Sequence, residues 1–245
     1  MLLLLLAACA TALATGFGAL PVYALRTKPG AVHPVLWGLA GGVMTVASIQ
    51  GLLLPALHET PDSGVFVGLL VGVCFLLVAR RALGRRDLHI GTIRGADARR
   101  AVLVFAVLFV HSLPEGLALG AAWASGTAGL GVFVFLAIAV QNVPEGTATA
   151  IPLRDAGVGP SRAFWAATLT SAPQPVGAIA AYALVTSVHS LLGASFGFAA
   201  GAMLALVVAE IAPTALAGPH RRAGVAAAVG SAAVMAALGV VLSFD

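Results

Sequence analysis

The sequence predicts an all-α integral membrane protein, and three observations lead to this fold class. The chain has 245 residues, of which 60% are hydrophobic and 9% charged, and its mean hydropathy is +1.03. A soluble domain of this composition would lack the polar residues needed to cover its surface. The apolar residues fall into runs of about 20, the length of a helix that crosses a hydrocarbon core of about 30 Å. Finally, the lysines and arginines lie between these runs or at their ends.

Eight runs are long enough to span a membrane, and polar or Pro/Gly-rich segments separate them. The predicted helices are residues 2–24, 34–57, 64–83, 101–123, 127–152, 161–185, 190–217 and 223–243. The longest polar stretch, residues 79–100, contains the predicted cytoplasmic loop 84–100 and leaves little room for a soluble domain. We therefore expect a single polytopic membrane domain covering residues 1–245.

The first run has an alternative interpretation as a cleaved signal peptide. "LAAC" at residues 6–9 resembles a lipoprotein cleavage box. However, no lysine or arginine precedes the run, and the box comes very early, so we expect helix 2–24 to be retained. Cys9 and Cys74 fall in different predicted spans and indicate neither a disulfide framework nor a thiolate metal site.

The positive charges predict the orientation. If both termini face outward, all 13 lysines and arginines fall in four cytoplasmic loops, as the positive-inside rule requires. We expect a multi-pass protein of the bacterial inner membrane. The excess of basic residues then reflects topology and contact with the lipid bilayer, and does not indicate nucleic-acid binding.

Three of the nine acidic residues, Glu115, Glu145 and Glu210, fall within predicted spans. An ionisable group inside a membrane costs several kcal/mol unless it faces a cavity, a partner or an ion, so each suggests a function.

Two of these glutamates belong to a repeated motif, "HSLPEG" at 111–116 and "QNVPEG" at 141–146. His111 and Glu115 are four residues apart, as are Gln141 and Glu145, so each pair lies on one helix face. A short loop joins helices 101–123 and 127–152, which must then be antiparallel. We expect the two pairs to meet at a similar depth.

The proline and glycine of each motif suit this position. Pro114 and Pro144 cannot donate a backbone hydrogen bond, which frees polar backbone that is tolerated where it lines a cavity. Gly116 and Gly146 let a neighbouring helix approach closely.

The converging side chains are one imidazole, one amide and two carboxylates. Imidazole with carboxylates suits Zn²⁺, Fe²⁺ or Mn²⁺, whereas Ca²⁺ and Mg²⁺ prefer oxygen ligands throughout. A single buried histidine is often only a hydrogen-bonded packing residue. Two copies of the motif at matched depth favour a transition-metal site.

The two motifs, with "GGVMTVASIQGLLLPAL" at 41–57 and "GFAAGAMLALVVAEIAPTA" at 197–215, resemble the bacterial branch of the ZIP (Zrt-, Irt-like) divalent-metal transporters. The resemblance covers essentially the whole chain. It implies eight helices in a 3+2+3 arrangement, in which helices 1–3 and 6–8 form an inverted repeat around metal-binding helices 4 and 5. The metal ligands it implies are His111, Glu115, Gln141 and Glu145. A second, adjacent site would use Ser112, Asn142 and Gln174 together with the two glutamates.

The chain departs from the family pattern at that second site. Gln174, in "SAPQPVGA", stands where the family often has a carboxylate, and Ser112 replaces a usual asparagine. The two remaining carboxylates balance one divalent ion, and unpaired charge is expensive in a low-dielectric site. We therefore expect a single metal ion.

Other polar residues suggest a transport path. Glu59, Asp62 and Asp245 fall at the outer ends of predicted helices, where they could attract cations or simply form a solvated rim. Glu210, near the cytoplasmic end of helix 190–217, reads as an exit-path ligand or, alternatively, as the partner of a loop arginine.

We expect a transporter that brings a divalent transition metal into the cytoplasm by alternating access, without a resident cofactor and without enzyme activity. Zinc is the expected substrate, with iron, manganese or cadmium as alternatives. A metal-dependent intramembrane hydrolase and a metal-selective channel are the alternative functions. Glycines at residues 68–73 would permit a homodimer.

Overall fold

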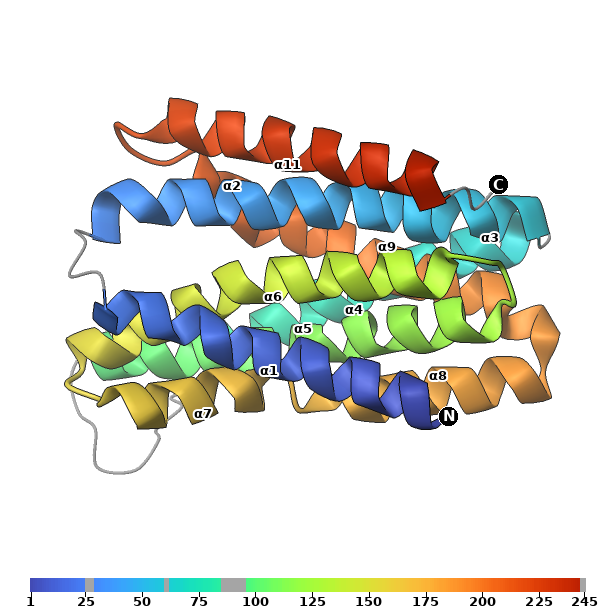
Figure 1. Cartoon of the computed structure of the whole chain (residues 1–245), viewed down its shortest axis with the longest axis horizontal. Helices are drawn as coiled ribbons and strands as arrows, with labels where there is room; N and C mark the ends of the chain where they lie inside the picture. Colours follow the sequence, from blue (N-terminus) through green and yellow to red (C-terminus); the bar gives the residue numbers. More distant parts are fainter. Residues whose placement is uncertain (25–28, 60–61, 85–95, 243–245) are drawn as a thin grey trace.

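Helices running along one long axis make up the described structure (Figure 1). The computed structural model describes residues 1–24, 29–59, 62–84 and 96–242. The first half contains α1 (Leu2–Ala24), α2 (Pro29–Ser48), η1 (Ile49–Leu53), α3 (Leu54–Glu59), α4 (Asp62–Gly84) and α5 (Ala96–Ala124). The second half contains α6 (Leu130–Asp155), α7 (Pro160–Thr170), α8 (Pro173–Ser187), η2 (His189–Leu191), α9 (Leu192–Leu206), η3 (Val207–Ile211), α10 (Ala212–Ala215) and α11 (Arg221–Leu242).

Seven helices within the described residues are long and apolar enough to cross a membrane. Each overlaps one of the predicted spans, which confirms an all-α, multi-pass membrane protein. Two of the seven contain a π-helical turn, η1 between α2 and α3 and η3 between α9 and α10. Most of the predicted loop 84–100 lies outside the described residues, and α5 already begins at Ala96.

The predicted helix 161–185 is wrong as one continuous element, because α7 and α8 are separate helices. The carbonyls of Leu169 and Ser171 would normally accept from the residues four positions on, which are Pro173 and Pro175. Prolines have no N–H, so these carbonyls accept instead from Ala172 (3.1 Å) and Gln174 (3.0 Å), three positions on. The α-helix therefore stops and restarts at this step.

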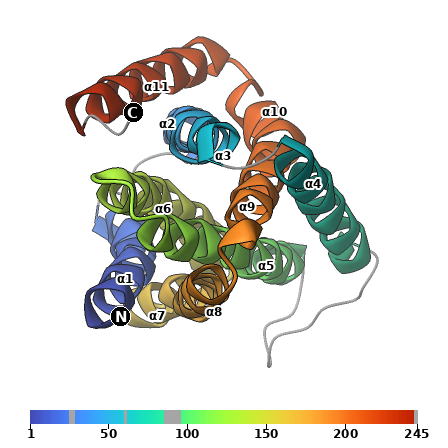
Figure 2. The same ribbon diagram turned by 90° about the vertical axis from the view of Figure 1, so that its right-hand side faces the viewer.

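The helices pack in a pattern that places α5 and α6 between the others (Figure 2). The most extensive contacts join α1 to α6, α5 to α8, α2 to α11, and α4 to α9. Polar side chains lie inside, whereas large apolar side chains on α4 and α11, such as Leu70 and Val241, are exposed. This distribution is the one expected when lipid is the surrounding solvent.

Two glycines of the 68–73 segment face the interior of the bundle. A Cβ atom at Gly68 or Gly72 would collide with the backbone of α9 at Ala194 or Phe198. These glycines therefore serve packing within the chain, and the predicted homodimer stays a prediction that they do not support.

Candidate metal centre

The helix α5 carries His111 and Glu115 one turn apart, on its buried face. Both side chains are fully buried, and Nε2 of His111 lies 3.3 Å from Oε1 of Glu115. The helix runs unbroken through Pro114, between the two. The four-residue spacing thus places imidazole and carboxylate together, as predicted.

The helix α6 presents Gln141 and Glu145 to the same point. The amide Nε2 of Gln141 donates to Oε1 of Glu115, and Nε2 of His111 lies 3.9 Å from Oε1 of Glu145. His111, Glu115 and Glu145 each have a potential ligand atom within 4.8 Å of those of the other two residues. The structure therefore brings the four predicted side chains to one buried place.

Several polar atoms in this cluster make no hydrogen bond with the described residues. They are Nδ1 and Nε2 of His111, Oε1 of Gln141 and Oε1 of Glu145. Leaving buried polar atoms unpaired costs on the order of 1–3 kcal/mol each. Because imidazole nitrogen and amide and carboxylate oxygens are metal-ligand atoms, the donor set fits a transition-metal ion.

Two glycines let the helices around the cluster approach closely. A Cβ atom at Gly116 would overlap the backbone of Gln174 on α8, and one at Gly146 would overlap the carbonyl of Thr15 on α1. This confirms the close approach predicted for both positions. It also determines which helices flank the cluster, namely α8 beside α5 and α1 beside α6.

The predicted second-site residues are buried next to the cluster, but protein hydrogen bonds already use much of their capacity. Nε2 of Gln174 donates to Oε2 of Glu115, and Oε1 of Gln174 accepts from Thr11 Oγ1 at 2.8 Å. Asn142 donates to the carbonyl of Thr11 at 2.8 Å and to Oε1 of Gln174 at 3.3 Å. The hydroxyl of Ser112 donates to the carbonyl of Leu108, in its own helix, at 2.9 Å.

Residues of α1 and of the break before α8 complete this network, and the sequence patterns did not indicate them. Thr11 contacts both Asn142 and Gln174, and the hydroxyls of Thr15 and Ser171 lie 2.7 Å apart. All these side chains are buried. Threonines at four-residue spacing within the otherwise apolar run 2–24 were the available signal.

Of the predicted path residues, Glu210 lies outside the central cluster. Oε2 of Glu210, in η3, lies 2.8 Å from a guanidinium nitrogen of Arg80 on α4. Glu59 ends α3 and Asp62 begins α4, whereas Asp245 lies outside the described residues.

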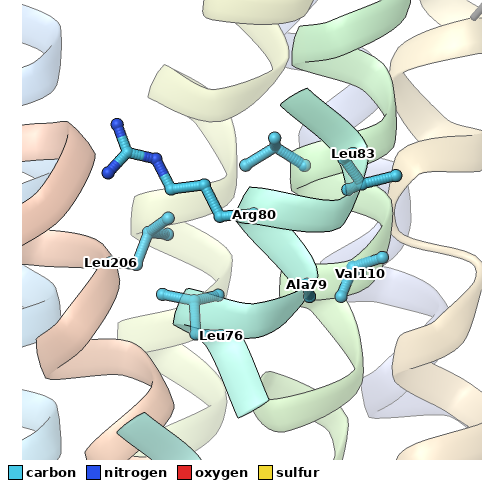
Figure 3. Close-up of a pocket in the computed structure, with 7 residues that line it drawn as sticks. Leu76, Ala79, Arg80, Leu83, Val110 and Leu206 are labelled. Carbon is cyan, nitrogen blue, oxygen red and sulfur yellow. The ribbon is translucent and has the colours of Figure 1, made fainter. Parts of the chain in front are cut away.

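Arg80, the partner of Glu210, lies beside a small apolar crevice between α4, α5 and α9. Figure 3 shows the Arg80 side chain pointing away from Leu83 and Val110, two other residues that line this crevice. The crevice is lined by Leu76, Ala79, Arg80, Leu83, Val107, Val110 and Leu206. The arginine stem covers apolar surface while its head reaches the carboxylate, an arrangement common for long basic side chains.

Comparison with known proteins assigns the family. Residues 87–240 match the Zip family, described as ZIP Zinc transporter. The chain belongs to the ZIP zinc transporter family. It is 33% identical over 224 residues to the zinc transporter GufA of Myxococcus xanthus, covering 85% of this chain and 87% of the relative. It is 30% identical over 218 residues to zinc transporter ZIPB of Bordetella bronchiseptica, covering 82% and 68%.

A plant relative has a larger chain. A putative zinc transporter of Arabidopsis thaliana, At3g08650, is 36% identical over 209 residues, which is 84% of this chain and 33% of that protein. The ZIP chain described here thus spans about a third of the plant relative. Family membership confirms the expectation of a divalent-metal transporter and does not favour the hydrolase alternative.

Proposed function

We propose that this ZIP chain imports Zn²⁺ into the cytoplasm through a site formed by His111, Glu115, Gln141 and Glu145. The observation that carries the proposal is the buried convergence of these side chains from α5 and α6, with four ligand-type atoms lacking hydrogen bonds to the described residues. The names of the relatives support zinc as the substrate. The same donor set would also accept iron, manganese or cadmium.

One ion at a time is the stoichiometry that the charges support. Glu115 and Glu145 together carry a formal charge of −2, which one divalent cation neutralises. The neighbouring Ser112, Asn142 and Gln174 are neutral and already bonded to protein atoms. A second ion would add two unbalanced positive charges to a buried site, which is strongly unfavourable.

An eight-helix, 3+2+3 arrangement with an inverted repeat is supported by how the helices pair. The contact of α1 with α6 has its counterpart in α8 with α5, and that of α2 with α11 has its counterpart in α9 with α4. The π-helical turns η1 and η3 also occupy corresponding helices. The start of α1 and the end of α11 lie at the same end of the bundle (Figure 1), which requires an even number of crossings. In this arrangement α7 and α8 together form the sixth span, which brings the total to eight.

Such a repeat supports alternating access. The substrate site lies at the interface of the repeats, and beside it α7 and α8 form a span that is broken between them. Both features are typical of secondary transporters. Movement of α5 and α6 against the flanking helices, or rocking of the repeats around them, would open the site to each side in turn.

The orientation we propose places both termini outside the bacterial inner membrane. Arg80 and Arg81 lie near the end of α4, Arg154 near the end of α6, and Arg221 and Arg222 at the start of α11. The end of α6 and the start of α11 lie at one end of the bundle, opposite to the start of α1 (Figure 1). The positive-inside rule assigns this end to the cytoplasm.

At that end, Glu210 would accept the ion on exit, in competition with Arg80. Glu59, at the end of α3, and Asp62, at the start of α4, would attract cations at the opposite end.

The proposal is tested by zinc uptake into proteoliposomes containing wild-type protein, Glu115→Gln or Glu145→Gln. Both variants preserve side-chain shape and remove a charged ligand. We expect uptake and bound zinc to fall at least about 100-fold, since even an outer-shell change near a metal costs 10–100-fold.

The matched control is Asp155→Asn, at the exposed end of α6, where the carboxylate contacts Arg154. It should transport normally. Uptake near the wild-type level in both glutamine variants would refute the assigned ligands, whereas ion currents far above carrier rates would favour a channel.

A further inference from the structure

An apolar groove lies on the cytoplasmic half of the bundle, away from the metal cluster. It has a volume of about 290 Å³ and runs between α2, α11 and the segment from η3 to α10. Its lining includes Thr45 of α2, Val207 and Ile211 of η3, and Val225, Val229 and Ala232 of α11. Its volume is close to that of small-molecule sites, which begin at about 300 Å³.

Small residues and a π-helical turn create the groove. A Cβ atom at Gly38 or Gly42 would collide with the backbone of α11, so these glycines set the close contact along one edge. The turn η3 contributes Val207 and Ile211 to the opposite wall. The hydroxyl of Thr45 donates to the carbonyl of Gly41, so this polar residue is satisfied within its own helix.

The groove opens toward the membrane. Val225 and Val229, which line it, are 44% and 65% exposed. On α11 the lining extends from Gly224 to Ala232, which at 1.5 Å per residue is about 12 Å. Half of a hydrocarbon core measures about 15 Å, so the groove follows most of the depth of one leaflet. Its lining and direction suit an acyl chain.

Positive charge stands at the cytoplasmic mouth. Arg221 and Arg222 begin α11, three and two residues before the groove-lining Gly224, and both are exposed. Among the described residues, neither forms an ion pair. A helix N-terminus is already electropositive, so these arginines are not stabilised by their own helix, and together they favour an anion.

We propose that this groove binds an anionic phospholipid, with one acyl chain between α2, η3–α10 and α11 and the phosphate at Arg221 and Arg222. The apolar lining recognises the chain, and the arginine pair selects a net negative headgroup over a zwitterionic one. Basic pockets between helices on the cytoplasmic side recognise lipid headgroups in this way.

The headgroup contact is tested by native mass spectrometry of the full chain in detergent. Dioleoylphosphatidylglycerol is compared with dioleoylphosphatidylcholine, and with glycerol phosphate, which lacks the chains. We expect the anionic lipid to bind about tenfold or more tightly than the zwitterionic lipid, and glycerol phosphate not to displace it.

Arg221→Gln combined with Arg222→Gln should remove that tenfold preference. The control double variant is Arg81→Gln with Arg162→Gln, which removes two exposed arginines from the same end of the bundle but not from this groove. Equal loss in both double variants, or equal binding of the two lipids by the wild type, would overturn the proposal in favour of a diffuse positive surface.

The chain contact is tested by filling the groove. Ala232→Phe should reduce binding of both lipids at least severalfold, whereas Val234→Phe, at an exposed position on another face of α11, should leave it unchanged. If Ala232→Phe does not fold, Val229→Trp serves the same purpose. Unchanged lipid binding in the folded variant would overturn the proposal. It would also be overturned if the wild type formed a dimer that retains no lipid and this substitution abolished the dimer, because a second copy of the chain would then occupy the groove.

Discussion

At the residue scale, hydrogen bonds within the cluster determine which atoms remain free for a cation. Gln141 and Gln174 each donate an amide N–H to Glu115, one to each carboxylate oxygen. Gln141 therefore directs its own Oε1 elsewhere, and this oxygen has no hydrogen-bond partner among the described residues. The glutamines thus orient the Glu115 carboxylate, and Gln141 keeps a neutral oxygen available for a cation.

Acidification should weaken zinc binding at this cluster. A proton and a metal ion compete for the same imidazole lone pair and carboxylate oxygens, so affinity is highest at higher pH and falls as pH decreases. Isothermal titration calorimetry measures zinc affinity at about pH 7.5 and about pH 5.5, on either side of the reference pKa of an imidazole. Equal affinity at the two pH values would argue against His111 as a ligand.

Restoring carboxylates beside the cluster should create a second metal position. Gln174→Glu combined with Asn142→Asp adds two negative charges, enough to balance another divalent ion. The substitution also disrupts the neutral network with Thr11. Metal content of the purified protein should rise from about one ion per chain toward two. A content of two tightly bound ions in the unmodified protein would show that the charge argument is wrong.

At the element scale, glycine contacts hold the flanking helices against α5 and α6. Gly146→Ala places a methyl group against the backbone carbonyl of Thr15, where neither helix can yield by side-chain rotation alone. We expect a loss of about 1–3 kcal/mol of stability, as for other overpacked sites. Thermal unfolding in detergent measures the effect.

Gly230→Ala is the matched control, because a Cβ atom at this helical position meets no atom within 4 Å. It should unfold at the same temperature as the wild type or higher, since alanine is favoured over glycine in a helix by about 1 kcal/mol. A Gly146→Ala variant as stable as this control would contradict a tight contact between α1 and α6.

The elements that sequence patterns predicted well are the long apolar helices and the paired motifs on α5 and α6. Apolar length and four-residue spacing are local properties, so both can be read directly from the chain. The break between α7 and α8 was missed because Pro173 and Pro175 lie within an apolar run of spanning length. The role of Thr11 was missed because it depends on packing between α1 and residues more than 130 positions away.

At the scale of the whole molecule, the two flanking sets of helices hold a polar centre inside an apolar exterior. The contacts of α1 with α6 and of α8 with α5 place a helix on either side of the cluster. Buried charge is tolerated there if an ion neutralises it, and the bilayer-facing side chains remain apolar. One ion between α5 and α6 would account for both the repeated motif and the unpaired buried atoms.

Anomalous diffraction at the zinc edge tests this central claim most directly. Crystals of the zinc-loaded protein should show one strong peak enclosed by His111, Glu115, Gln141 and Glu145, at ligand distances of about 2.0–2.2 Å from nitrogen and oxygen. A dominant peak outside this cluster, or two equally strong peaks within it, would contradict the account.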